Sequence, residues 1–393
     1  MTQPAPLSSA ALIAAASQRS GLTDFGKIDF REALDAYVDG LNQQLPLFAE
    51  RGSMIVQEEV VSALQHRLRI EDFISRNPQV REERISRPVF VTGLYRSGTT
   101  RMQNLLSADP RLIHLQAWQT IAPVPVGETL SDGQDPRVAT SQQALDMLKQ
   151  AAPHAAQAHP LDATDPSEEF PLMIPSFRAH DAKQVGSDFA NWLEVQDNTP
   201  MYRDLHRALQ VLQFQFKRPR VSEQRFTLKA PIHLGNVTPL LKVFPDAKII
   251  VTHRDPFPAV HSFAMVRESL RGLYCDTIDL EMVGGAILEQ AAGALTKLVA
   301  LRKTSSEGTF FDLGFGEVIG GLGDRLDDIY HFIDAPLTNE VRDILHRVDE
   351  QRDEHKSRAA RADAAIYGLS RDKVHDRTAD YLGWARDQIG ELV

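Results

Sequence analysis

Residues 88–100 read PVFVTGLYRSGTT, an apolar run followed by a glycine and a short polar loop. The run VFV is typical of a strand that is buried on both faces, and Pro88 ends the helical pattern before it. The segment TTRMQNLLSADP then resumes as a helix, which Pro110 stops. This stretch therefore predicts a strand–loop–helix junction, around which the rest of the fold can be placed.

Such a junction suits an anion, because the loop and the helix N-terminus direct backbone N–H groups at one spot. Gly93 and Gly98 permit the required backbone conformations, and Arg96 adds a full charge. Hydroxyls come from Ser97, Thr99 and Thr100. A loop that binds ATP would carry lysine where Thr99 stands. The alternative is an ordinary turn with a helix cap.

Further strands alternate with helices along the chain. RFTLK (225–229), AKIIVTHR (247–254) and TFFDLGF (309–315) read as strands, and a helix is expected over HLGNVTPLLKVF. The alternation predicts an α/β fold of three layers, with a central, mainly parallel sheet and flanking helices. The helical and loop-like segment at about 111–222 interrupts the strands, and we expect this insertion to cover the substrate.

The N-terminal part has a helical pattern. REALDAYVDGLNQQLPLF (31–48) and VQEEVVSALQHRLRIEDFISR (56–76) carry apolar residues at three- and four-residue spacing. Ser8 or Ser9 is expected to cap a first helix. We predict a helical extension over 1–85 that packs on an α/β domain over 86–393.

Composition narrows the function classes. The net charge of −10 and the pI near 5.7 argue against a sequence-independent grip on nucleic acid. The single cysteine, Cys275, excludes an internal disulfide and a multi-cysteine zinc site, which fits a cytoplasmic location. We expect no transmembrane segment, since no apolar stretch approaches roughly 20 residues. A homo-oligomer is left open.

A second anion motif follows the third predicted strand, in HRDPFPAVHSF (253–263). Arg254 lies at the strand end and Ser262 about two turns into the next helix. A ligand across the carboxyl ends of neighbouring parallel strands could touch both this motif and the first loop. The alternative is a helix that Asp255 caps, with a core serine behind it.

Together these motifs resemble the sulfotransferases that use 3′-phosphoadenosine 5′-phosphosulfate (PAPS). GLYRSGTT resembles their 5′-phosphosulfate loop, and an arginine followed eight residues later by a serine resembles their 3′-phosphate motif. The resemblance continues through LLSADPRLIHLQAW, DATDPSEEFPLM and LKAPIHLGNVTPLLKVFPDAKIIVTHRDP. It implies the P-loop-like sulfotransferase fold, PAPS as sulfuryl donor, no required metal, and a hydroxyl acceptor on a small or lipid-like molecule.

The resemblance also implies where the donor binds. In these enzymes an arginine and a glycine of the C-terminal region often contact the 3′-phosphate. The corresponding region here is the charged run HKSRAARADAAIYG, in which no residue aligns clearly with them. The implied contacts are Gly93, Tyr95, Arg96, Ser97, Gly98, Thr99, Thr100, Arg254, Ser262, Arg358 and Arg361.

Sulfuryl transfer depends on positioning and charge stabilisation. Arg96 suits the leaving phosphate, and Lys229, which stands where the family has a lysine, suits the sulfuryl oxygens. His233 is expected to face the same crevice as a base, or else to cap a helix or fill the core. Glu168 and Glu169 are the rival bases, of which a helix could point only one into the cleft.

One position departs from the family pattern. Relatives of this type usually carry glutamate after the tryptophan of AW, whereas Gln119 follows Trp118 here, which leaves the base unsettled. The insertion is rich in aromatics that could line an apolar acceptor pocket or belong to the core: Trp118, Phe170, Phe177, Phe189 and Trp192. A small-metabolite kinase and a catalytically silent nucleotide-binding scaffold are the alternative functions.

Overall fold

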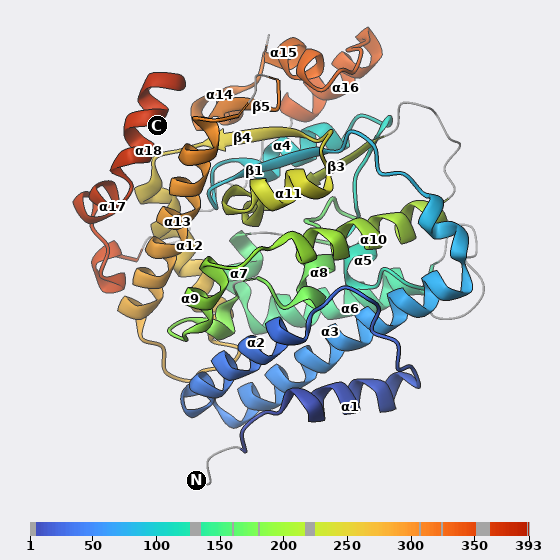
Figure 1. Cartoon of the computed structure of the whole chain (residues 1–393). Helices are drawn as coiled ribbons and strands as arrows, with labels where there is room; N and C mark the ends of the chain where they lie inside the picture. Colours follow the sequence, from blue (N-terminus) through green and yellow to red (C-terminus); the bar gives the residue numbers. More distant parts are fainter. Residues whose placement is uncertain are drawn as a thin grey trace.

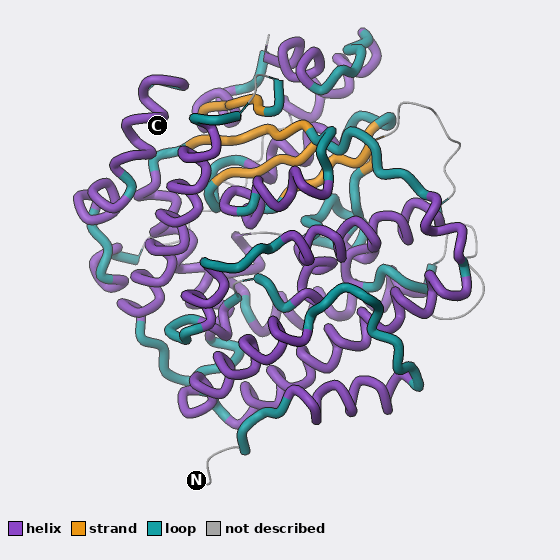
Figure 2. Tube along the Cα trace, in the orientation of Figure 1, coloured by secondary structure: helices purple, strands orange, loops and turns teal. Residues whose placement is uncertain are grey.

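The structure is a computed structural model that describes residues 5–125, 135–158, 161–179, 181–216, 225–305, 308–323, 325–350, 362–390 and 392. In these ranges the strands form one parallel sheet in the order β2-β3-β1-β4-β5. Their bounds are β1 Val89–Gly93, β2 Leu112–Ile113, β3 Arg225–Lys229, β4 Lys248–His253 and β5 Phe310–Gly314. The sheet is drawn in orange in Figure 2. The α/β fold with a parallel sheet is confirmed, and β2 is a strand that the sequence did not predict.

Helices cover both faces of the sheet. Successive residues of a strand point to opposite faces, and β1 shows this. Val89 and Val91 pack with α4 (Thr99–Ser107), α14 (Phe315–Gly320), α15 (Arg325–Phe332) and α16 (Asn339–Glu350). Phe90 packs on the other face with α10 (Thr199–Gln215), α11 (Val237–Val243), α12 (Pro256–Arg271) and α13 (Leu280–Arg302). Ile250 and Val251 of β4 divide in the same way. Burial on both sides explains why the strands read as continuous apolar runs.

The helices before β3 are α1 Ser9–Ser20, α2 Arg31–Gln44, α3 Glu50–Arg76, α4 Thr99–Ser107, α5 Ala117–Ile121, α6 Pro136–Ala151, α7 Pro153–Ala158, α8 Phe170–Met173, α9 Phe189–Glu194 and α10 Thr199–Gln215. Those after β3 are α11 Val237–Val243, α12 Pro256–Arg271, α13 Leu280–Arg302, α14 Phe315–Gly320, α15 Arg325–Phe332, α16 Asn339–Glu350, α17 Arg371–Arg377 and α18 Ala379–Gln388. No helix of the described ranges combines the length and the apolar character needed to cross a bilayer.

The N-terminal helices lie away from the sheet, at the bottom of Figure 1. Ser8 caps α1, as predicted, by accepting a hydrogen bond from the backbone N–H of Ala11. A separate apolar cluster joins α1, α2 and α3 to Phe177, Phe189 and Tyr274. The N-terminal helices therefore pack on the insertion and on the segment after α12, the same parts of the chain that enclose the cavity described below.

Candidate functional site

The loop between β1 and α4 has the backbone of an anion cradle. Arg96 and Gly98 both adopt left-handed conformations, with φ of 65° and 94°. A Cβ at Gly98 would lie 2.9 Å from Cγ1 of Val318, so glycine is needed for space as well as for conformation. The first N–H groups of α4 have no acceptor within the helix, so they face the end of the loop. An anion placed there would meet these groups and the positive end of the helix dipole.

The hydroxyls of the loop have different roles. The Ser97 hydroxyl is fully buried, donates to the Leu94 carbonyl (2.6 Å) and lies 2.7 Å from the Thr252 hydroxyl. It therefore ties the loop to β4. Thr99 is also buried. The Thr100 hydroxyl accepts a hydrogen bond from Nζ of Lys229 at 3.3 Å, so it lies where the first loop meets the end of β3.

Lys229 is the charged centre of the site. Its side chain is fully buried at the end of β3, and its Nζ lies 2.5 Å from a carboxylate oxygen of Glu168, which is 27% exposed. An ammonium group buried in this way needs a charged or hydrogen-bonded partner, and Glu168 and Thr100 supply it. Lys229 therefore lies between the first loop and Glu168.

The two adjacent glutamates separate in space. Glu168 lines a cavity, whereas Glu169 is fully buried and accepts a hydrogen bond from the backbone N–H of Lys229 at 2.8 Å. Its other oxygen bonds Nε2 of His233, and Nδ1 of His233 lies 2.9 Å from the Tyr202 hydroxyl. Glu169 therefore fixes the backbone of Lys229, and His233 in turn fixes the carboxylate of Glu169.

The expectation that His233 faces the crevice is wrong. Its imidazole is fully enclosed, and its ring meets Phe90 edge-on with centroids 5.0 Å apart. Both of its ring nitrogens are engaged inside the protein. His233 can therefore act only through Glu169, as a positioning residue, and of the three predicted bases Glu168 alone lines the cavity.

The second motif reaches the first. Arg254 follows β4, the sheet neighbour of β1, and its Nη1 donates to the carbonyl of Arg96 at 2.7 Å. Its guanidinium also lies 3.9 Å from the ring centroid of Phe315. Ser262 is half-buried on α12. The two arginines thus lie at the same edge of the sheet, whereas Arg358 and Arg361 fall outside the described residues.

Asp255 has the capping role that the sequence offered as an alternative. It accepts a hydrogen bond from the backbone N–H of Phe257 at the start of α12, and it pairs with Arg371 (2.5 Å) and His375 (2.8 Å). With its oxygens so engaged, Asp255 is poorly suited to hold the magnesium ion that the kinase alternative requires.

A cavity of about 390 Å³ opens beside Glu168. Tyr95 forms part of its wall, stacks on Phe263 of α12 and accepts a hydrogen bond from Gln290 (2.7 Å); burial raises the pKa of this phenol. Most of the lining is apolar, and α6, α7 and α12 contribute part of it. The volume and the lining are those of a site for a small organic molecule.

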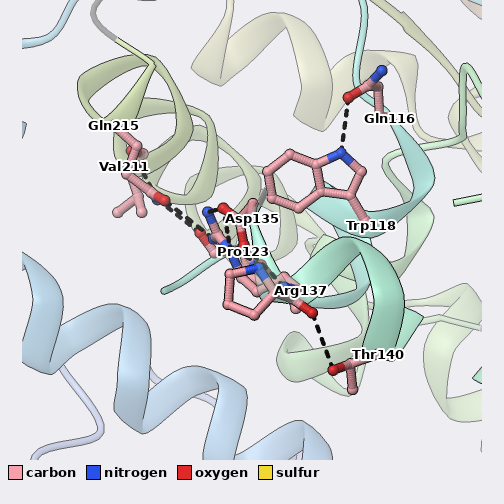
Figure 3. Close-up of polar contacts among 10 residues, drawn as sticks. Gln116, Trp118, Pro123, Asp135, Arg137, Thr140, Val211 and Gln215 are labelled. Atoms are coloured by element: carbon pink, nitrogen blue, oxygen red, sulfur yellow. Dashed lines mark hydrogen bonds and ion pairs between the residues drawn. The ribbon is translucent and has the colours of Figure 1, made fainter. Parts of the chain in front are cut away.

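The insertion aromatics are mostly core. Phe170 lines the cavity, but Trp118, Phe177, Phe189 and Trp192 pack in apolar clusters. Figure 3 shows Trp118 beside Arg137, whose guanidinium carbon lies 4.7 Å from the indole centroid. This arginine pairs with Asp135 (2.6 Å) and donates to the Ala122 carbonyl (3.0 Å), so the cluster is structural.

Gln119 also has a structural role. Its side-chain oxygen accepts a hydrogen bond from the backbone N–H of Gln116 at 2.8 Å, which forms a capping box at the start of α5. A glutamate could make the same contact. Gln119 is not part of the cavity wall, so its presence takes no proton acceptor away from the site.

The fold and the site together define an α/β protein with an anion cradle at the edge of a parallel sheet, a buried lysine and an apolar cavity. The model of the sulfotransferase family matches residues 88–339. The chain therefore belongs to the sulfotransferase family, whose members transfer sulfo groups.

Solved structures and curated sequences agree with this assignment. The chain resembles sulfotransferase STF1 of Mycobacterium tuberculosis (25% identity, 95% of this chain and 99% of that one, TM-score 0.81). It also resembles sulfotransferase STF9 of Mycobacterium avium (27% identity, 98% of both chains, TM-score 0.82). In sequence it is 24% identical over 259 residues to omega-hydroxy-beta-dihydromenaquinone-9 sulfotransferase Stf3 of M. tuberculosis and of Mycobacterium bovis. These matches span 63% of this chain and 62% of the relatives.

Proposed function

We propose that this protein transfers a sulfuryl group from PAPS to a hydroxyl of a lipid-like acceptor bound in the cavity. The observation that carries the proposal is the position of Lys229. Its buried Nζ touches Thr100 of the anion cradle on one side and Glu168 of the cavity wall on the other. An anionic donor in the cradle and an acceptor in the cavity would therefore meet at this ammonium group.

The residues of the cradle suit the donor. PAPS carries a 5′-phosphosulfate and a 3′-phosphate, and the chain offers one basic residue in each motif, Arg96 and Arg254, which are in contact. The helix N-terminus of α4 adds N–H donors, as sites for phosphate and sulfate often do. Since Thr99 replaces the lysine of an ATP loop, the cradle fits a donor without a magnesium-bridged triphosphate better than it fits ATP.

PAPS supplies the activated sulfuryl group, whose bond to the phosphate oxygen breaks as the acceptor oxygen bonds to sulfur. In our proposal the Glu168 carboxylate accepts the proton of the acceptor hydroxyl. Lys229 stabilises the negative charge on the sulfuryl oxygens, and Arg96 stabilises the charge on the leaving phosphate. The buried Glu169 and His233 keep the Lys229 backbone in place.

The acceptor side is apolar. Leu145, Leu148, Leu161 and Val266 are among the lining residues, and they would remove an alkyl or isoprenoid chain from water. The name of Stf3 describes an acceptor of this chemical kind, a hydroxylated menaquinone. We therefore place the acceptor among hydroxylated amphiphiles, and the reaction in the cytoplasm.

The test is calorimetric titration with adenosine 3′,5′-bisphosphate and, in parallel, with ATP and magnesium, followed by turnover of radiolabelled PAPS with long-chain alcohols. We expect the bisphosphate to bind and ATP to bind weakly, and sulfation to depend on Lys229 and Glu168. A preference for ATP would contradict the donor assignment. Binding of the bisphosphate without turnover of any acceptor would favour the silent scaffold.

A further inference from the structure

An arginine in the cavity wall has donors that the protein does not use. Arg267 of α12 is 5% exposed and lines the cavity. In the part of the chain that the structure describes, it donates no hydrogen bond and pairs with no carboxylate, and its Nε is buried without an acceptor. Its contact inside the protein is with the ring of Phe263, 5.1 Å from the guanidinium carbon to the ring centroid.

Two other buried arginines of this protein, Arg67 and Arg271, differ. Arg67 donates to the Phe25 carbonyl at 2.8 Å and pairs with Asp204 at 2.7 Å. Arg271, one turn after Arg267, donates to the Ala182 carbonyl (3.0 Å) and to Gln44 (2.7 Å). A buried guanidinium without such acceptors is costly. The donors of Arg267 are therefore available to whatever occupies the cavity.

The charges around Arg267 favour an anionic partner over a neutral one. Arg271 and Lys183 add two cations near it, and the carboxylates in this region are already engaged. Asp181 bonds the Tyr37 hydroxyl and pairs with Lys183 (3.0 Å). Burial opposes the charge of Asp181, but Lys183, the Tyr37 hydroxyl and the more distant charge of Arg267 hold its pKa below the ordinary value. Glu59 pairs with Lys183 (3.0 Å).

Arg267 lies farther from the anion cradle than Phe263 does, on the same helix. Phe263 stacks on Tyr95 beside the anion cradle, and Phe263, Val266, Arg267 and Leu270 follow one face of α12 along the cavity. At 1.5 Å per residue, Arg267 lies about 6 Å farther along this helix than Phe263. A molecule with its hydroxyl at Glu168 can therefore place a second polar group at Arg267.

We propose that the acceptor is bifunctional: a hydroxylated amphiphile that also carries a carboxylate, which binds the guanidinium of Arg267. The proposal rests on the function proposed above and narrows its substrate class from lipid-like alcohols to hydroxy acids of the ω-hydroxy fatty acid kind. The apolar wall binds the chain, Glu168 and Lys229 take the hydroxyl end, and Arg267 selects the acid end.

The first experiment measures binding alone, without a sulfuryl donor. Dodecanoate and dodecan-1-ol are titrated into the wild type, into Arg267→Leu and into Lys149→Leu. Lys149 is a matched control, because it is a second cation of the cavity wall that already pairs with Asp162 at 2.6 Å. We expect the wild type and the Lys149 variant to prefer dodecanoate by about tenfold or more, and Arg267→Leu to lose this preference while still binding the alcohol.

Equal binding of acid and alcohol by the wild type would overturn the proposal. Loss of the preference in Lys149→Leu instead would move the carboxylate to the cavity rim and overturn it as well. If Arg267→Leu lowers thermal stability but keeps the preference, then the arginine is structural and the proposal fails. Partial recovery of the preference in Arg267→Lys would support it.

The second experiment measures turnover with PAPS. Free ω-hydroxy fatty acids are compared with their methyl esters, which keep the hydroxyl but lack the charge. We expect kcat/KM to favour the acids in the wild type and to become equal in Arg267→Leu. Sulfation of esters and acids alike would refute the role of Arg267 and leave the proposed function intact. Absence of all sulfation, with the binding preference retained, would refute the proposed function and leave the carboxylate site intact.

Discussion

The substitution of glutamine at Glu168 and at Glu169 should separate the roles of these two neighbours. Glu169 is fully buried, and both of its oxygens accept hydrogen bonds, one from the Lys229 backbone N–H and one at His233 Nε2. Glutamine has one acceptor oxygen and one donor nitrogen. If its oxygen accepts from Lys229, its NH₂ group faces His233, whose Nε2 must then accept and whose Nδ1 must donate to Tyr202.

The magnitude follows from the contacts. A hydrogen bond to a charged group is worth about 1.5–3 kcal/mol and a neutral one about 0.5–1.5 kcal/mol. Glu169→Gln weakens two such bonds in an enclosed site, so we expect a loss of about 2 kcal/mol in the free energy of unfolding. Glu168 is 27% exposed. Its replacement by glutamine keeps an acceptor for Lys229, and we expect a loss of about 1 kcal/mol or less.

Activity should show the reverse order. Removing a general base lowers turnover by about 10²–10⁴-fold, so we expect Glu168→Gln to lose at least a hundredfold in kcat. Glu169→Gln should keep kcat within about tenfold when assayed well below its melting temperature. Urea unfolding and initial rates with PAPS measure the two effects on the same samples. Unchanged stability of Glu169→Gln would refute the buried network, and full turnover of Glu168→Gln would refute its role as the base.

Further predictions concern the cradle and the helix that follows β4. Lys229→Ala should lower kcat far more than it lowers the affinity for adenosine 3′,5′-bisphosphate, and a loss confined to calorimetric affinity would reassign this lysine to binding. Arg254→Ala should weaken bisphosphate binding by about tenfold or more with an unchanged circular dichroism spectrum, whereas wild-type affinity would remove it from the donor site. Gly98→Ala should destabilise the protein by about 1–3 kcal/mol in urea because φ is 94° there, and unaltered stability would show that the loop relaxes. For Asp255, burial opposes the charge, but hydrogen bonds from α17 and from the α12 backbone hold its pKa below the ordinary 3.8. This stabilisation should be complete above pH 3.8 and lost as the pH falls through the lower folded pKa. The difference in free energy of unfolding between wild type and Asp255→Asn should therefore disappear in acid. A difference that stays constant down to pH 2 would contradict the assignment.

The anion cradle that we propose for the donor was predictable because it is local in sequence. The anion cradle is one contiguous strand–loop–helix segment, and each of its steric demands is visible as a residue type, such as glycine at 93 and 98. β3, β4 and β5 were predicted from apolar runs that are bounded by turns. The two-residue β2 was missed, because Leu112 and Ile113 are too few to show a period.

The orientation of individual side chains was harder to predict from the sequence. Nothing in the sequence DPSEEF distinguishes Glu168 from Glu169, and the outcome depends on β3 and on His233, which lie about sixty residues later. The sequence also did not show the role of Gln119, whose side-chain oxygen accepts a hydrogen bond from the backbone N–H of Gln116. Composition gives the set of candidate groups, whereas tertiary contacts determine which of them reach the cavity.

The apolar face of α12 already singles out Arg267 in the sequence. In the helix PFPAVHSFAMVRESLR, this arginine lies on the same face as Phe263, Val266 and Leu270. A charge on an apolar stripe has to find a partner within the protein or in a ligand. Among the described residues, Arg271 finds hydrogen-bond acceptors in the protein and Arg267 does not. In our proposal the acceptor, rather than the fold, completes the contact at Arg267.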